Sequence, residues 1–156
     1  MAEFPAPPSL PQPAYAQASG PSGPRAGFWS RLAAALLDGI LLGVVNVLLD
    51  IGVGRAGSLL ALAIGIAYFG YLEGSSSGQT VGKRALGIRV IDFSTGGPIG
   101  FGRAVIRYFG RIVSTIPIFL GYFWMLWDKE RQTWHDKFAN DVVVPVSSYP
   151  VAHWPN

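Results

Sequence analysis

The sequence of 156 residues contains no cysteine and only two histidines, His135 and His153. Disulfides, thiol catalysis, iron–sulfur clusters and cysteine-built zinc sites are therefore excluded, and two histidines are too few for a histidine-built metal site. Charge is also scarce, because 13% of the residues are charged, whereas a soluble domain carries about 25%. We therefore expect neither metal nor cofactor, and we expect lipid to surround the long uncharged stretches of the chain.

The basic residues, which give a net charge of +3, flank the apolar segments. This arrangement is explained by membrane topology better than by nucleic-acid binding, since the sequence contains neither a recognition fold nor a stacking platform. We expect no nucleic-acid partner and no enzymatic activity.

The two ends of the chain differ in composition from the region between them. Seven of the twelve prolines lie in residues 1–24, among Ala, Ser, Gln and Gly. Such a segment buries too little apolar surface to offset its ordering entropy, so it predicts a disordered tail, and it lacks the pattern of a signal peptide. Residues 147–156 are predicted to be a second tail, which leaves a membrane domain at 25–146.

Two apolar segments are predicted to cross the membrane. Phe28–Leu49 contains 22 residues, roughly 33 Å of helix, which is enough for a bilayer core about 30 Å thick. Ser58–Leu72 follows after a short glycine-rich link. Gly39 and Gly43 form a G-x-x-x-G pair, which serves close helix packing, more commonly within a chain than in a dimer.

Two later segments resemble each other: GQTVGKRALGIRVI at 78–91 and RQTWHDKFANDVVV at 131–144. Each predicts a helix start at Gln-Thr, one amphipathic turn and a strand, and the two strands can pair to cap one side of the helices. A match this short is compatible with duplication and with chance.

The repeat bears on the apolar segment between its copies. If both copies lie in one compartment, residues 104–127 form a re-entrant hairpin broken near Pro117. The alternative is a third full span at 112–127, with the C-terminus outside. Arginines four residues apart predict an amphipathic helix at the membrane surface: Arg103, Arg107 and Arg111.

The basic residues predict the orientation. Residues 73–111 contain six basic residues and two acids, whereas the link between the first two spans contains only Arg55. The positive-inside rule therefore places the N-terminus, the central segment and the C-terminus in the cytoplasm of the cell membrane.

Asp38 is the outstanding polar residue, because it lies midway along the first span. A carboxylate at mid-membrane costs about 2.5–3.5 kcal/mol on insertion scales, so it must face protein or water. Arg31, seven residues earlier, and Asn46 lie on the same helical face. Asp38 is either an ion- or proton-binding group or one member of an interhelical salt bridge, with Arg103 or Arg107 as partner.

These features resemble the RDD family of small bacterial multi-pass membrane proteins, named for one arginine and two aspartates. AGFWSRLAAALLD, TVGKRALGIRV and RQTWHDKFANDVVV are similar to the family pattern in order and spacing, over about residues 26–145. Arg31 and Asp38 match the arginine and the first aspartate. The second aspartate falls on Asp136, with Asp128 as the runner-up. Asn140–Asp141 departs from the pattern, where small residues and threonine are more usual.

The predicted fold is all-α: two transmembrane helices, a third hydrophobic hairpin or span, and a small cytoplasmic cap of short amphipathic helices and strands. Two functions are open. The resemblance implies a small cation/proton transporter, since some members resemble antiporters, with Asp38 as the titrating site. The alternative is a non-catalytic accessory or assembly subunit. A chain this small offers little interior for an ion path, so we expect a homo-oligomer or a larger membrane-protein complex.

Overall fold

The computed structural model describes residues 23–54, 56–116 and 120–149. Most of the two predicted tails lies outside these ranges, as do Pro117 and His153.

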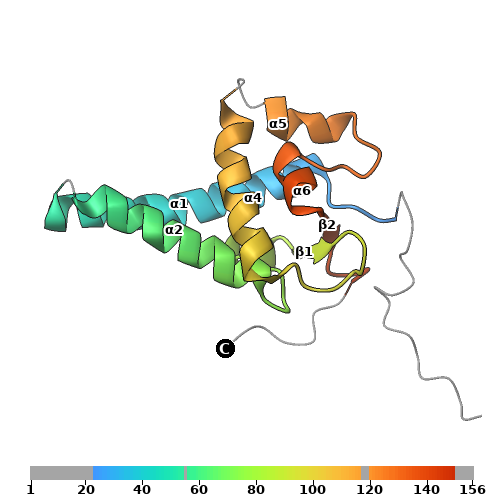
Figure 1. The fold of residues 1–156 in the computed structure, drawn as a ribbon, viewed down its shortest axis with the longest axis horizontal. Helices are drawn as coiled ribbons and strands as arrows, with labels where there is room; N and C mark the ends of the chain where they lie inside the picture. The colour runs from blue at the N-terminus through green and yellow to red at the C-terminus, as the bar shows by residue number, and fades with distance from the viewer. Residues whose placement is uncertain (1–22, 55, 117–119, 150–156) are drawn as a thin grey trace, which may run out of the picture.

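Two long apolar helices form an antiparallel hairpin, α1 (Phe28–Val53) and α2 (Ala56–Gly74) (Figure 1). Both are long and apolar enough to cross a membrane, so the two predicted spans are confirmed as helices, with longer bounds than predicted. Helix α1 ends at Gly54, whose φ of +60° suits glycine and whose N–H donates to the Asp50 carbonyl at 3.1 Å. The far half of the hairpin extends beyond all the other elements (Figure 1).

The third apolar region consists of separate helices. Helix α4 (Gly100–Thr115) crosses the hairpin (Figure 1). The short helix α5 (Leu120–Phe123) and the 3₁₀ helix η2 (Trp124–Leu126) then run in a different direction from α4. The two parts are bent by 113° relative to each other. This geometry agrees with a re-entrant hairpin or a broken span and differs from one straight helix over 112–127.

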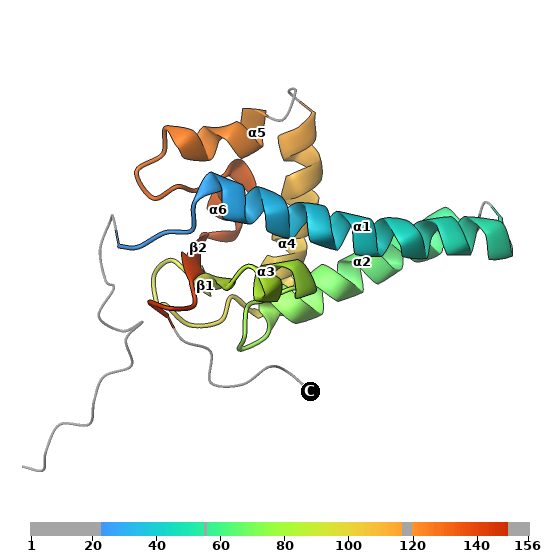
Figure 2. The same ribbon diagram turned by 180° about the vertical axis from the view of Figure 1, so that it is seen from behind.

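The base of the hairpin is covered by two helix–strand units, which we call the cap. The first unit is α3 (Val81–Ala85) with β1 (Ile88–Asp92), and the second is α6 (Trp134–Ala139) with β2 (Asp141–Pro145). The strands pair antiparallel, with Val90 opposite Val143, and both units gather at one end of the hairpin (Figure 2). The predicted helices and strands are present, but the side of the membrane on which the cap lies stays a prediction.

The two units share their backbone geometry at an offset of 53 residues (131 − 78). Gly78 and Arg131 both have positive φ, 62° and 51°, just before each unit begins. Gly87 and Asn140, again 53 apart, both have positive φ between helix and strand, 63° and 49°. Positive φ is uncommon outside glycine, so its recurrence in Arg131 and Asn140 supports duplication over chance.

Side chains repeat at the same offset. The Gln79 Nε2 donates to the Ile88 carbonyl at 2.9 Å, and the Gln132 Nε2 donates to the Asp141 carbonyl at 2.8 Å. Thr80 and Thr133 both precede the first residue of a helix and accept a backbone N–H in the first turn. Because Val90 lies opposite its own counterpart Val143, the units are related by a local two-fold rotation through this pair.

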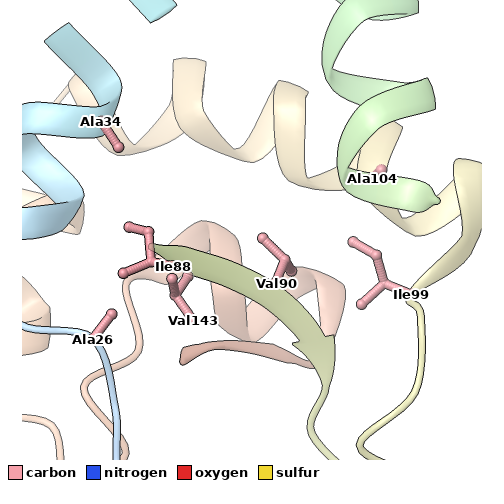
Figure 3. Close-up of a cluster of buried hydrophobic side chains, with 7 residues drawn as sticks. All are labelled: Ala26, Ala34, Ile88, Val90, Ile99, Ala104 and Val143. Atoms are coloured by element: carbon pink, nitrogen blue, oxygen red, sulfur yellow. The ribbon is translucent and has the colours of Figure 1, made fainter. Parts of the chain in front are cut away.

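A small apolar cluster joins the cap to the helices. Ile88, Val90 and Val143 from the sheet lie close to alanines of α1 and α4 (Figure 3). Alanine at these two contacts lets the helices approach the sheet closely. The cluster consists of Ala26, Ala34, Ile88, Val90, Ile99, Ala104 and Val143.

Candidate functional site: a buried ion network between hairpin and cap

Asp38 holds the first helix–strand unit through uncharged donors. Its carboxylate accepts hydrogen bonds from the Thr80 hydroxyl at 2.6 Å, the Gly82 N–H at 2.8 Å and the Tyr68 hydroxyl at 2.8 Å. The side chain is only 2% exposed. A Cβ at Gly82 would collide with the Ala34 carbonyl and with Asp38, so the absence of a side chain at Gly82 permits this close approach.

These contacts contradict one of the two alternatives predicted for Asp38, the salt bridge to Arg103 or Arg107. The salt bridges formed by the described residues do not include Asp38, and Arg103 and Arg107 pair with other acids. Three donors solvate the carboxylate without an opposite charge. Asp38 lies about 15 Å from the start of α1 and about 22 Å from its end, and its bonds to Thr80 and Gly82 place it beside the first unit of the cap.

Arg31, two turns before Asp38, holds the second unit in a corresponding way. It donates to Asp136 Oδ2 at 2.5 Å, to the Thr133 hydroxyl at 3.4 Å and to the Arg131 carbonyl at 2.9 Å. Asp136 in turn accepts the Thr133 N–H at 2.8 Å, completing a capping box. One face of α1 therefore fixes both copies of the repeat, the first by an acid and the second by a base.

Arg107 of α4 is the centre of the network and is 1% exposed. Its Nη1 lies 2.5 Å from Asp136 Oδ1 and also pairs with Asp141, and its Nε lies 3.2 Å from Glu73 Oε2. Arg107 thus links the end of the hairpin to both α6 and β2. Such a buried cation requires these carboxylates, since an unpaired buried charge is very costly.

Glu73, at the end of α2, forms ion pairs with the remaining basic side chains of α3 and α4. It pairs with Lys83 and with Arg111 as well as with Arg107. The guanidinium of Arg111 also lies 4.2 Å from the centre of the Phe69 ring. Counting Arg31, the network holds four basic side chains against three acids, Glu73, Asp136 and Asp141.

Burial and charge set the protonation of the cap residues. Burial alone would raise the pKa of Asp136, but the charges of Arg107 and Arg31 hold it well below its ordinary value. Burial raises the pKa of Asp141 to about 7 in spite of Arg107, and the negative charge of Asp136 adds to this rise. Burial lowers the pKa of Lys83 to about 8, against the effect of Glu73, and it lowers the pKa of His135 well below the usual range. Near neutral pH His135 is therefore uncharged and Asp141 can gain a proton.

The other predicted site residues lie elsewhere. Arg103 pairs with Asp92 and donates to the carbonyls of Ala139 and Asn140 at the sheet. Asp128 pairs with Lys137 at 2.5 Å and caps the turn before α6, and Asn46 is exposed on α1.

The network also contains members that were not predicted as site residues. They are Glu73, Lys83, Arg111 and Asp141. Arg111 was signalled by the arginine spacing, and Asp141 by its departure from the family pattern.

An apolar helical hairpin, closed at its base by two similar helix–strand units and a buried ion network, defines a membrane-type protein. The RDD family model matches residues 25–140. The chain belongs to the RDD family, and the predicted resemblance is confirmed.

The chain is similar to two mycobacterial proteins and to one protein of Bacillus subtilis. The proline-rich antigen homologue of Mycobacterium tuberculosis (strain ATCC 25618 / H37Rv) is 40% identical over 86 residues, which is 53% of this chain and 35% of the relative. The proline-rich antigen of Mycobacterium leprae (strain TN) is 36% identical over 88 residues, 56% of this chain and 35% of the relative. The protein YxaI of Bacillus subtilis (strain 168) is 26% identical over 147 residues, 76% of this chain and 96% of the relative. The matches cover about a third of the length of the two mycobacterial relatives, and no solved structure matches.

Proposed function

We propose that the chain is a non-catalytic membrane module that assembles with other transmembrane helices through α1. The observation that carries the proposal is the open surface at Gly39 and Gly43, where an added Cβ would meet no atom within 4 Å among the described residues. Two glycines four residues apart let another helix approach closely in lipid. Neither glycine packs against the described residues of this chain, so the pair is open to a helix of a second chain.

The surroundings of the carboxylates support assembly over transport. A cation/proton carrier needs an acid that binds either ion in competition. Both oxygens of Asp38 already accept hydrogen bonds, and Glu73 and Asp136 are each paired with two or more cations. On this proposal Asp38 is a structural acceptor that fixes the cap.

The second candidate is cation/proton transport through Asp141. Burial raises its pKa to about 7, and its Oδ2 is buried without a hydrogen-bond partner among the described residues. The protonation of Asp141 can therefore change near neutral pH.

The proposal includes the orientation of the chain in the membrane. The basic residues are concentrated in the cap and α4, whereas the link at the hairpin tip contains Arg55 alone. The positive-inside rule supports a cytoplasmic cap and cytoplasmic termini.

Assembly is tested by gentle solubilisation at native expression, followed by light scattering and identification of stoichiometric partners. We expect wild type and Gly52→Leu to form a homo-oligomer or a defined complex, and Gly43→Leu to be monomeric. Gly52 is the matched control, because it lies on the same helix and is equally open. A monomeric wild type without a partner would refute assembly.

Transport is tested by proton movement in sealed vesicles after addition of Na⁺, K⁺ or Li⁺ salts. A cation-dependent flux that vanishes in folded Asp141→Asn would establish the second candidate. Absence of flux leaves the assembly role as the function of the chain.

A further inference from the structure

A cavity of about 500 Å³ lies beside the ion network, between α1 and the α4–α6 region. Side chains of α1 form much of its apolar wall, together with Phe69 and Phe123. Its volume is within the range of small-molecule sites in proteins, about 300–1,000 Å³.

The charged part of the wall is strongly basic. Arg31, Lys83, Arg107 and Arg111 line the cavity, and Asp38 is the only acid among the described lining residues. The counter-charges Glu73, Asp136 and Asp141 are not in the lining. The charged groups of the lining are therefore mainly basic, with Arg31 and Arg111 the most exposed of them, and they match an anion.

Arg111 offers an unused donor at this wall. Its Nη2 pairs with Glu73, whereas its Nη1 is buried and has no hydrogen-bond partner among the described residues. Phe69 lies under the guanidinium and helps to orient it. A phosphate oxygen accepts hydrogen bonds from guanidinium groups with favourable geometry.

The apolar wall continues onto the part of the hairpin that faces lipid. Leu32 and Leu36 line the cavity and are 37% and 59% exposed, and Ile40 further along α1 is 66% exposed. An acyl chain buries apolar surface against such a wall, whereas a free inorganic or sugar phosphate has no apolar surface to bury.

We propose that this cavity binds one phospholipid with an anionic headgroup, its phosphate at Arg111 and Arg31 and an acyl chain along Leu32 and Leu36. Such a lipid complements the basic wall and covers the apolar one at the same time. The cavity and the proposed helix contact share Gly39, so the two proposals are separated at Gly43, which belongs to the helix contact and lies outside the cavity lining.

The test uses the purified full chain in detergent and native mass spectrometry with three probes: dioleoylphosphatidylglycerol, dioleoylphosphatidylcholine and free glycerol 3-phosphate. We expect one phosphatidylglycerol per chain, bound at least about tenfold more tightly than phosphatidylcholine. The phosphate of phosphatidylcholine can accept the same hydrogen bonds, but its quaternary ammonium group is repelled by the basic wall. Glycerol 3-phosphate at the same concentration should not displace it.

Two pairs of variants locate the site. Gly39→Phe fills the cavity without removing a charge and should abolish lipid binding, whereas Gly43→Phe, one turn further along α1 and outside the lining, should keep it. Arg111→Gln should weaken binding about tenfold, whereas Lys129→Gln, the same change of charge at an exposed loop position, should leave it unchanged.

Three results would overturn the proposal. They are equal binding of the two lipids, retention of phosphatidylglycerol by Gly39→Phe, and displacement by free glycerol 3-phosphate. Because Gly39→Phe removes none of the charged side chains, this variant tests lipid binding in the cavity even if Arg111→Gln fails to fold. Oligomeric state is read from the same spectra, so failure of lipid binding and failure of assembly are distinguished.

Discussion

Replacing Arg107 by methionine should destabilise the protein far more than the same change at Arg103. Arg107 is 1% exposed and faces three carboxylates. After its removal Asp136 keeps Arg31, and Glu73 keeps Lys83 and Arg111, but the described contacts leave Asp141 without a cation. Breaking a buried pair by removing one partner costs about 3–5 kcal/mol, which is a large part of a total stability of about 5–15 kcal/mol.

Arg103→Met is the matched control, one helical turn away on α4. Its side chain is 33% exposed and pairs with Asp92 near the surface, and exposed pairs contribute about 0–1 kcal/mol. Both variants lose one positive charge, and Arg103→Met also loses two hydrogen bonds to carbonyls of the sheet, so a larger loss of stability at Arg107 is assigned to its buried ion pairs.

The assay is urea unfolding in micelles, followed by the fluorescence of the five tryptophans. We expect the free energy of unfolding to fall by about 3–5 kcal/mol for Arg107→Met and by about 1 kcal/mol or less for Arg103→Met. Adding Asp141→Asn to Arg107→Met should restore part of the loss, because it removes the buried carboxyl group that has lost its cation. Equal losses at the two arginines, or no restoration, would refute the buried network as the source of stability.

Three further predictions follow from the same contacts. The pKa of Asp141 in the folded protein, about 7, lies above its ordinary value of 3.8, so its contribution to stability should be complete below about pH 4. This contribution should be lost as the pH rises to 7, by up to about 1.4 kcal/mol per pH unit. Urea titrations at several pH values should show this slope in the wild type, and the same slope in Asp141→Asn would contradict the assignment. Asp38→Asn presents an amide donor to donors already in place, at a cost of about 1–3 kcal/mol, and should lower the amount of membrane-inserted protein on immunoblots, whereas Asn46→Ala at the exposed position should not; equal levels would show that the Asp38 contacts are dispensable. Reporter fusions after Val146 should report the cytoplasm, and an external signal would instead establish a third span.

The sequence was sufficient to predict the hairpin and the repeat. Long uncharged runs have few alternatives to membrane helices, and the paired Gln-Thr starts predicted both short helices correctly. The pairing of β1 with β2 also followed from the repeat, because its two copies end in similar strands.

The partners within the site could not be predicted in the same way. An arginine partner was one of the two alternatives predicted for Asp38, whereas its three donors are uncharged and one of them is the backbone N–H of Gly82. Glu73 and Asp141 join the network through contacts between residues tens of positions apart, which depend on how α4 crosses the hairpin. Local spacing carries no information about such a crossing.

The pairing of β1 with β2 has a consequence for the biogenesis of this chain. The ribosome completes β1 at Asp92 and begins β2 only at Asp141, 49 residues later. At about 5–20 residues per second this interval lasts about 2–10 s, during which β1 has no partner strand and Arg107 lacks two of its three acids. The hairpin is therefore expected to enter the membrane before the polar end of the molecule can close, and the emergence of β2 completes the enclosure of the charges that came before it.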